Sequence, residues 1–279
     1  MADQTIRRAR WDRFFSAKNR IEANYVSSHP NYPAHDHAFM EIQLIVAGTC
    51  LQRTSLGDTR PVAGDVFLFR PGAWHAYEEV DGLSLYNCCF DSTLLARELA
   101  WMIDHPMLGS LLWFIPLSPQ QHGVAALHLP PREVARCRSI LDALRRLARK
   151  DPAALFADEL GLLLQFLGAL ARHIPTELVR KTDALSHSAV AAAIRLIDER
   201  PADPWTLTSL AQRVHVEPTY FVRLFRKAVG LPPMAYLTNR RAELAAVLLR
   251  DTVEPVSEVG RLVGWPDPNP FRRSFREKF

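Results

Sequence analysis

Short runs of β-branched and aromatic residues alternate with turn residues between about residues 20 and 90. The runs are EIQLIVAG, DVFLFRPG and LSLYNCCF, and the segments SLGDTRPVAGD and EVDGLS between them are rich in Gly, Asp and Pro. Runs of this length bounded by turn residues are typical of β-strands. Several strands at such short, regular spacing predict a sandwich or a small barrel.

The spacing of apolar residues changes to a helical period after about residue 92. One helix is expected over PREVARCRSILDALRRLARK, because apolar residues recur every three or four positions and a proline stands in its first turn. A second is expected over DPAALFADELGLLLQFLGALARHIP, between its cap Asp151 and Pro175. Its apolar residues are Leu155, Leu160, Leu162, Leu163, Leu164, Phe166, Leu167 and Leu170. A face this broad either only covers the sheet or also forms the seam of a dimer. In the second case Leu163 and Leu167 are expected to face outward.

Residues 175–187 lack an apolar period and are expected to link an N-terminal domain, residues 1–174, to a C-terminal domain, residues 188–279. The C-terminal domain is helical again, and the segments RPADPW, HVEP, GLPP, DTVEP and GWPDPNP divide it into short helices. The predicted fold class is therefore α+β with two domains: an N-terminal β-barrel with following helices, and a compact all-α domain. A chain of 279 residues with 48% hydrophobic content is long enough for both cores.

Composition restricts the location and partners of the chain. No apolar run is long enough to span a membrane, and the charged start MADQTIRRARWDRFF does not resemble a signal peptide. The four cysteines, Cys50, Cys88, Cys89 and Cys137, show no C-x-x-C spacing and are expected to be reduced core residues. We therefore expect a cytoplasmic protein with no membrane partner. The net charge of +4 permits binding to nucleic acid without implying it.

Two segments of the C-terminal domain repeat one pattern of a short helix, a turn and a second helix. They are TLTSLAQRVHVEPTYFVRLFRKAVG and PVSEVGRLVGWPDPNPFRRSFREKF. This pattern is typical of helix-turn-helix units, whose second helix enters the major groove of double-stranded DNA. The second helices, residues 217–229 and 267–279, each carry a net charge of +2. Basic residues also solvate the outer face of ordinary amphipathic helices, but two copies at matched positions favour contact with phosphates.

This domain resembles the DNA-binding domain of the AraC/XylS transcription regulators. The resemblance rests on YFVRLFRKAVG, on PPMAYLTNRRAELAAVLL as the long connecting helix, and on VSEVGRLVGWPD leading into FRRSF. Among the departures from the family pattern, two concern the reading helices. Glu217 stands where a serine usually caps the first reading helix, and Pro268 and Pro270 lie near the start of the second. The resemblance implies a double helix-turn-helix regulator with double-stranded DNA and RNA polymerase as partners.

The resemblance also implies which side chains contact DNA. Base-edge contacts are expected from the first turns of the two reading helices: Thr219, Tyr220, Val222 and Arg223, then Asn269, Arg272 and Arg273. An arginine there can bind guanine through two hydrogen bonds, and an asparagine can bind adenine. Arg226 and Lys227 are expected to contact phosphate.

The stretch HDHAFMEIQLIVAG, residues 35–48, gathers polar side chains on one face of a predicted strand. Side chains alternate across a strand, so residues of equal parity share a face. The odd-numbered set is His35, His37, Glu41 and Gln43, and the even-numbered set is Met40, Ile42, Leu44 and Val46. The odd face therefore collects imidazoles and a carboxylate, whereas the even face needs a hydrophobic cover, expected from the helices after residue 92.

Together with GDVFLFRPGAWHAYEE, this stretch resembles the two motifs of the cupin superfamily, a small jelly-roll barrel. The resemblance implies a barrel in which four side chains converge: His35, His37, Glu41 and His75. Three imidazoles and one carboxylate suit Zn, Ni, Fe or Mn. Sensor domains of AraC/XylS regulators often carry similar residues and bind an organic effector directly, and a strand can also carry histidines without any ligand. A pocket for either kind of ligand is expected between Phe39, Gln43, Phe67, Phe69, Trp74, Tyr77 and Tyr86.

The predicted function is a sequence-specific DNA-binding transcription regulator, not an enzyme, that responds to a small molecule or metal in its cupin-like barrel and forms a homodimer. Such an effector must bind one arrangement of the sensor better than another. By resemblance, the N-terminal arm, residues 6–24, is expected to close over the pocket. The alternative is a metal-dependent cupin enzyme, such as a dioxygenase or an isomerase, with an appended helical domain.

Overall fold

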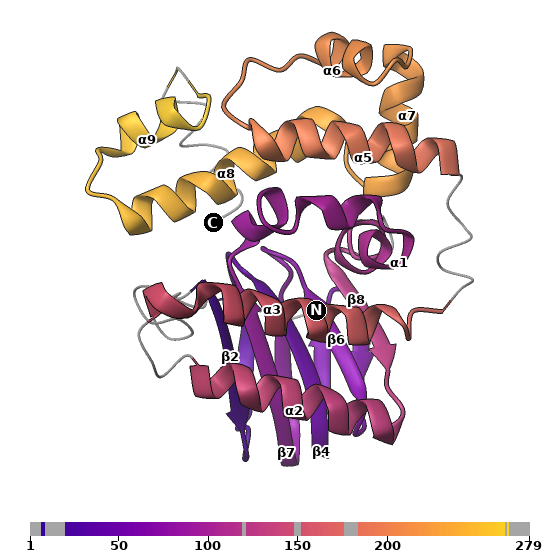
Figure 1. The fold of residues 1–279 in the computed structure, drawn as a ribbon, viewed down its shortest axis with the longest axis vertical. Helices are drawn as coiled ribbons and strands as arrows, with labels where there is room; N and C mark the ends of the chain where they lie inside the picture. Colours follow the sequence, from indigo (N-terminus) through magenta and orange to yellow (C-terminus); the bar gives the residue numbers. More distant parts are fainter. Residues whose placement is uncertain are drawn as a thin grey trace. The chain divides into compact units, whose positions relative to one another are not determined.

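The computed structural model describes residues 7–8, 20–118, 121–147, 152–175, 184–265 and 267 (Figure 1). The chain divides into two compact units. The first comprises Met1–Ser92, Pro106–Pro116 and Gln121–Val179, and the second comprises Thr93–His105, Leu117–Gln120 and Arg180–Phe279. Most of the predicted linker and of the N-terminal arm lies outside the described residues. None of the described helices combines the length and apolar character that crossing a bilayer requires.

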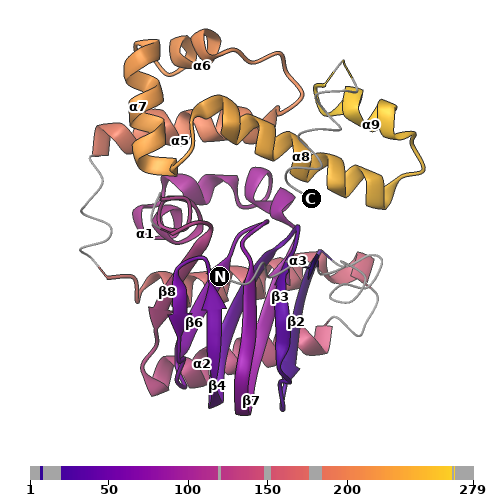
Figure 2. The same ribbon diagram turned by 180° about the vertical axis from the view of Figure 1, so that it is seen from behind.

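One antiparallel sheet dominates the first unit (Figures 1 and 2). Its strands are β1 (Arg7–Arg8), β2 (Ile21–Val26), β3 (Tyr32–Asp36), β4 (Met40–Thr54), β5 (Gly57–Thr59), β6 (Asp65–Phe69), β7 (His75–Phe90) and β8 (Val124–His128). The order is β1-β3-β7-β4-β6-β8, with β2 also paired to β7 and β5 to β4. Only the short β1–β3 pair among these strands is parallel. The strand-rich region predicted between residues 20 and 90 is confirmed.

The two longest strands, β4 and β7, bend together and enclose an interior. They pair along nearly their whole length, and their register shifts between Ile45 and Leu51. Beyond these shifts the second half of β4 bends back over the first half. The hydrogen bond that Gln52 Nε2 donates to Gln43 Oε1, 3.2 Å long, shows how closely the two halves approach. Gly48 permits the bend: its φ is +76°, and a Cβ there would lie 2.2 Å from the backbone of Gly82.

Two helices cover the outer face of the sheet, as Figure 1 shows. They are α2 (Pro131–Leu147) and α3 (Pro152–Ala171). On α2 the residues Cys137, Ile140, Leu141 and Leu144 are buried, in agreement with the predicted helical period. On α3, however, Leu163 and Leu167 are completely buried within the unit. The expectation that these two leucines face outward is therefore wrong, whereas Leu162 is only partly buried.

Short helical turns follow β7. They are η2 (Ser92–Ala96), η3 (Ala100–Asp104), α1 (Pro106–Gly109) and the π-helical turn η4 (Ser110–Phe114). Within the second unit, Asp104 at the end of η3 forms an ion pair with Arg195.

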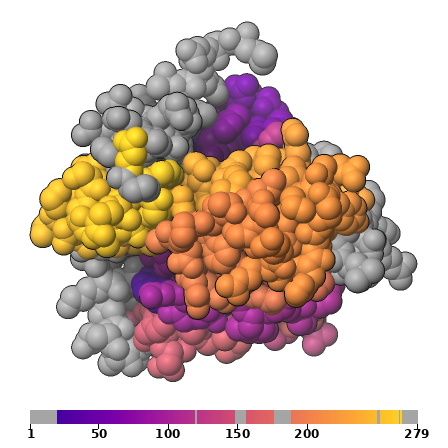
Figure 3. Space-filling model, turned by 90° about the horizontal axis from the view of Figure 1, so that it is seen from above, coloured from indigo at the N-terminus to yellow at the C-terminus, as the bar shows by residue number. Residues whose placement is uncertain are grey.

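The second unit contains five described α-helices with a shared core. They are α5 (Ala184–Glu199), α6 (Leu207–Arg213), α7 (Pro218–Val229), α8 (Pro233–Asp251) and α9 (Val256–Leu262). Leu210 and Ala211 of α6 are buried, as are Phe221, Leu224 and Phe225 of α7, which matches the inward residues expected for the first helix-turn-helix unit. The outer surface of these helices is visible in Figure 3 in orange and yellow.

A buried charged cluster joins α5 to α8. Arg240 of α8 donates from Nε to Asp198 Oδ1 of α5 at 2.7 Å and from Nη1 to Glu243 Oε2. Tyr236 donates its hydroxyl to the same Asp198 at 3.1 Å. All four residues are buried, so the attraction between these charges is only weakly screened by water.

Candidate functional site

Three side chains converge inside the sheet of the first unit. His37 follows β3, Glu41 lies near the start of β4, and His75 begins β7. His37 Nε2 lies 3.0 Å from Glu41 Oε2, and His75 Nε2 lies 3.4 Å from the same oxygen. One ligand atom of each residue lies within 4.8 Å of the other two, and all three side chains are at most 2% exposed.

The hydrogen bonds of the His37 ring determine which of its nitrogens faces the cluster. Its Nδ1 lies 2.8 Å from the carbonyl oxygen of Phe39, which can only accept, so Nδ1 carries a proton. In the neutral ring Nε2 is then a bare lone pair directed at Glu41. The Phe39 ring stacks on His37 at 4.3 Å, and Phe69 stacks on His75 at 4.2 Å. Both imidazoles are therefore held in place by aromatic neighbours.

Two ligand atoms of the cluster lack a hydrogen-bond partner among the described residues. They are Nε2 of His37 and Oε2 of Glu41, which approach each other to 3.0 Å without hydrogen-bond geometry. Nε2 of His75 lies 3.4 Å from the amide nitrogen of Gln43, which donates to it. The cluster therefore holds three ligand atoms close together, of which those of His37 and Glu41 have no hydrogen-bond partner among the described residues.

Burial and the neighbouring charges shape the electrostatics of this site. Burial raises the pKa of Glu41, but the contact with His37 and the nearby imidazoles of His75 and His35 outweigh it and lower the pKa to about 2. Burial lowers the pKa of His75 well below its usual value and also lowers the pKa of His35. Burial thus favours the neutral form of His75 and of His35.

His35, the fourth predicted ligand, lies beside the cluster. It pairs with His75 across β3 and β7, and the two rings are 4.2 Å apart. Its Nδ1 lies 3.0 Å from the carbonyl oxygen of Pro33. The structure therefore brings together three of the four predicted ligands and places His35 against the ring of one of them.

The residues predicted to line a pocket separate into two groups. Phe39, Phe69 and Tyr77 have rings that contact the histidines of the interior, and Phe67 and Gln43 are also buried. Trp74 is partly buried. Tyr86, in contrast, pairs with Leu44 and donates its hydroxyl to Asp142 of α2 at 2.9 Å. Tyr86 therefore packs on the outer face, and its prediction as a pocket residue is wrong.

Two polar residues of the interior were not predicted from the sequence. Asn87 pairs with Gln43 across β7 and β4, and Gln52 donates to Gln43. Gln52 is even-numbered, so strict alternation along β4 places it on the apolar face. The register shifts between Ile45 and Leu51 turn it inward.

The predicted DNA-contacting residues of α7 lie along one exposed side. Thr219, Tyr220, Arg223, Arg226 and Lys227 are exposed, and Val222 is partly buried. Glu217 caps the helix by accepting from the backbone N–H groups of Thr219 at 2.9 Å and Tyr220 at 2.7 Å. The guanidinium of Arg223 lies 5.8 Å from the ring centre of Tyr220. Asn269, Arg272 and Arg273 lie outside the described residues.

Each of the two units matches a known protein family. The family described as AraC-like ligand binding domain matches residues 20–165, and the family described as helix-turn-helix domain matches residues 210–279. The chain belongs to the AraC family of transcription regulators. The predicted AraC-family membership and two-domain α+β fold class are therefore confirmed.

Relatives of this AraC-family regulator match over most of their length. The HTH-type transcriptional activator RhaS of Escherichia fergusonii is 26% identical over 89% of this chain and 84% of its own. The RCS-specific HTH-type transcriptional activator RclR of Escherichia coli K12 is 26% identical over 77% of this chain and 75% of its own. Fatty acid-bound ToxT of Vibrio cholerae shares the fold, with a TM-score of 0.52 at 11% identity over 93% of this chain and 91% of its own. The protein is a ligand-responsive, DNA-binding transcription regulator, and its homologues are regulators rather than enzymes.

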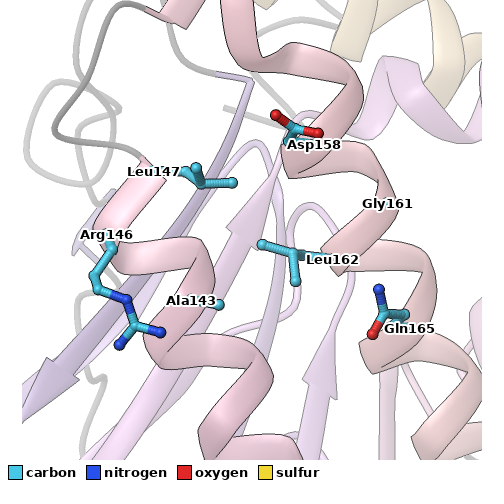
Figure 4. Close-up of a pocket in the computed structure, with 7 residues that line it drawn as sticks. All are labelled: Ala143, Arg146, Leu147, Asp158, Gly161, Leu162 and Gln165. Atoms are coloured by element: carbon cyan, nitrogen blue, oxygen red, sulfur yellow. The ribbon is translucent and has the colours of Figure 1, made fainter.

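The AraC-family regulator also has a hollow between α2 and α3, shown in Figure 4. Its volume is about 510 Å³. The lining residues are Ala143, Arg146, Leu147, Asp158, Gly161, Leu162 and Gln165. In Figure 4 Leu147 and Leu162 point into the hollow from the two helices, while Arg146 and Asp158 lie at its rim.

Proposed function

We propose that the barrel of this regulator senses a transition metal ion bound by His37, Glu41 and His75, and that the bound metal changes the affinity for DNA. The observation that carries the proposal is the 3.0 Å approach of His37 Nε2 to Glu41 Oε2, two buried acceptors without hydrogen-bond partners among the described residues. Two acceptor atoms at this distance repel each other unless a proton or a cation lies between them. A metal ion removes this repulsion.

The chemistry of the three ligands favours the same metal ions that the sequence analysis named. Two imidazoles and one carboxylate suit Zn, Ni, Fe or Mn, and a set of three protein ligands leaves coordination positions open. Glu41 supplies one negative charge in a buried site, which favours binding a cation over binding an anion. The bound metal would regulate only by binding one arrangement of the sensor more tightly than another.

Elemental analysis of protein purified without a histidine tag tests the metal site. After supply of Zn, Ni, Fe or Mn, the wild type should carry about one equivalent of metal. His37→Ala and His75→Ala should each remove it, because two remaining ligands hold the ion much less tightly. The matched control is His128→Ala, because His128 is exposed, pairs with Asp65 and is not one of the three proposed metal ligands. A metal-free wild type contradicts the site, and metal that leaves DNA affinity unchanged contradicts the regulatory role.

For DNA recognition, we propose that α7 lies in the major groove with Thr219, Tyr220, Val222 and Arg223 toward base edges and Arg226 and Lys227 toward phosphates. The exposed side of α7 and its concentration of positive charge support this arrangement. By family resemblance, the second helix-turn-helix unit contributes Asn269, Arg272 and Arg273. We also propose action in the cytoplasm with RNA polymerase as a partner, because the homologous proteins RhaS and RhaR are transcriptional activators.

We further propose that the chain forms a homodimer through the hollow between α2 and α3. The floor of this hollow is apolar, with Ala143, Leu147 and Leu162, and its rim carries Arg146 on α2 and Asp158 on α3. A twofold axis would bring each arginine toward the aspartate of a second copy, so the surface is complementary to itself.

The alternative function, a metal-dependent cupin enzyme, depends on the same three metal ligands. The homologues RhaS and RhaR are transcriptional activators, which favours the regulator over the enzyme.

A further inference from the structure

Three consecutive residues of α8 face three different parts of the second unit. Neighbouring side chains on a helix point about 100° apart. Arg240 reaches α5, whereas Ala242 belongs to the apolar core that α8 forms with α9. Arg241, between them, donates from Nε to the carbonyl oxygen of Pro201 and from Nη2 to that of Asp203, both at 2.7 Å. One turn of α8 therefore holds α5, the loop that follows α5, and α9.

The turn that follows α9 approaches the same loop. Gly264 has a φ of +93°, and a Cβ at this position would lie 2.8 Å from the carbonyl oxygen of Ala202 and 2.9 Å from Cζ of Arg241. A side chain at position 264 would therefore force the loop or the turn to shift. Trp265, the next residue, is buried in the core between α8 and α9. We call Ala202, Arg241 and Gly264 the brace.

The brace lies at the entrance to both helix-turn-helix units. The loop, residues 200–205, ends at Thr206, which caps α6, the first helix of the first helix-turn-helix unit. α6 packs against α7, the proposed reading helix. Gly264 lies just after α9, the first helix of the second helix-turn-helix unit, and the predicted second reading helix, residues 267–279, follows it closely in the sequence. A displacement within the brace would therefore move one helix-turn-helix unit relative to the other.

The hydrogen bonds of Arg241 are suited to fixing a position. Among the described residues its acceptors are backbone carbonyls, and no carboxylate there forms an ion pair with it. A guanidinium holds its N–H groups in one rigid plane, so two bonds to one loop define both the distance and the orientation of that loop. A lysine, with a flexible stem and a single ammonium group, offers no such geometry. The contact therefore depends on the direction of the bonds more than on the charge.

We propose that the brace fixes the angle between the two helix-turn-helix units, so that affinity for an operator depends on the spacing of its two half-sites, the segments that the two units read. Rigidly joined units engage two major-groove segments only at the separation and rotation that the protein presents. One extra base pair between the half-sites turns the second segment by about 34–36°, because the duplex makes one turn in about 10–10.5 base pairs. A flexible joint would tolerate this change. The inference rests on the proposed contact of both units with DNA.

The test measures binding of the full-length protein to three duplexes by fluorescence anisotropy. A duplex that the wild type selects from a randomised library supplies the operator. Interference by missing bases locates its half-sites, and the contacts that Arg223→Ala loses identify the half-site of α7. The second duplex has one base pair inserted between the half-sites. The third keeps the half-site of α7 and has the other half-site scrambled.

The variants are Arg241→Met, Arg241→Lys and Gly264→Ala. The matched control is Arg261→Met, because Arg261 of α9 is exposed and its ion-pair partner among the described residues is Glu258. The inserted base pair should cost the wild type and the control about tenfold or more in affinity, as expected when contacts to one half-site are broken. This spacing penalty should fall severalfold in Arg241→Met and Gly264→Ala, while their affinity for the third duplex stays at the wild-type level. Arg241→Lys should behave like Arg241→Met, because it keeps the charge without the two fixed bonds.

Several results overturn the inference. A wild type without a spacing penalty, or variants that keep the full penalty, show that the brace does not set the spacing. An equal loss of affinity on all three duplexes assigns Arg241 to the stability of the first helix-turn-helix unit, and a wild-type penalty in Arg241→Lys shows that the charge matters instead of the paired bonds. An operator with one half-site overturns the brace together with DNA contact by the second helix-turn-helix unit. Two half-sites with an unchanged penalty overturn the brace alone.

Discussion

Replacing Arg240 by methionine should strongly destabilise the helix-turn-helix unit. The methionine retains most of the side-chain volume but leaves the carboxylates of Asp198 and Glu243, whose side chains are only 4% and 8% exposed, without their shared cation. The Tyr236 hydroxyl still donates to Asp198, but it carries no charge to offset the buried anion. Removal of one partner from a buried ion pair typically costs about 3–5 kcal/mol, so we expect a loss of this size in the free energy of unfolding.

Urea unfolding of the full chain, followed by circular dichroism, measures this loss. The matched control is Arg241→Met, because the neighbouring Arg241 is half-buried and its acceptors among the described residues are the backbone carbonyls of Pro201 and Asp203. Its loss should cost roughly 1–3 kcal/mol, since the acceptors left behind are neutral. Adding Asp198→Asn to Arg240→Met should recover part of the loss, because one buried negative charge disappears. A cost for Arg240→Met below about 1 kcal/mol, the range of an exposed ion pair, would refute the reasoning.

Three further predictions concern DNA binding, assembly and helix capping. Arg223→Ala should cost about 1–3 kcal/mol and relax the preference at one base pair, whereas Lys227→Ala should weaken all sequences alike and reduce the salt slope by about one. Fluorescence anisotropy on substituted operators measures both, and identical behaviour contradicts the assigned roles. Leu162→Glu should give folded monomers in sedimentation, whereas Leu163→Glu should unfold the first unit. A wild type that is itself monomeric contradicts the proposed dimer surface between α2 and α3. Glu217→Ala should lower the urea midpoint of unfolding, because two backbone N–H groups of α7 lose their acceptor, and Glu217→Ser should restore most of the loss.

The sequence pattern was sufficient for the elements whose environment is uniform along their length. The β-branched runs of β4, β6 and β7 and the helical period of α2 predicted these elements because one face of each is buried over most of its length. Parity also placed Glu41 and Gln43 on one face, since β4 is regular from Met40 to Ile45. The resemblance to the two cupin motifs added His75 to this set. A local pattern thus predicted much of the candidate metal site.

The same reasoning was wrong where tertiary contacts decide the environment. Tyr86 lies one residue before Asn87 on β7, and only the pairing with Leu44 shows that the tyrosine faces α2. On α3, the apolar residues surround so much of the helix that the sequence does not distinguish Leu163, which is buried, from Leu162, which is partly exposed. The choice between Leu162 and Leu163 does not follow from hydrophobicity, because the two side chains are identical.

Bulges explain why the inward position of Gln52 cannot be predicted from the sequence pattern, although the positions of Glu41 and Gln43 can. Strict alternation from Gln43 sends Gln52, nine positions later, to the opposite face of the strand. The shifts between Ile45 and Leu51 reverse that parity, and the bend at Gly48 then carries Gln52 back over Gln43. An irregularity that is costly in a flat sheet is therefore what brings two amides of one strand together. In a barrel of this kind, the polar residues beyond a bulge are the ones that a sequence pattern assigns to the wrong side.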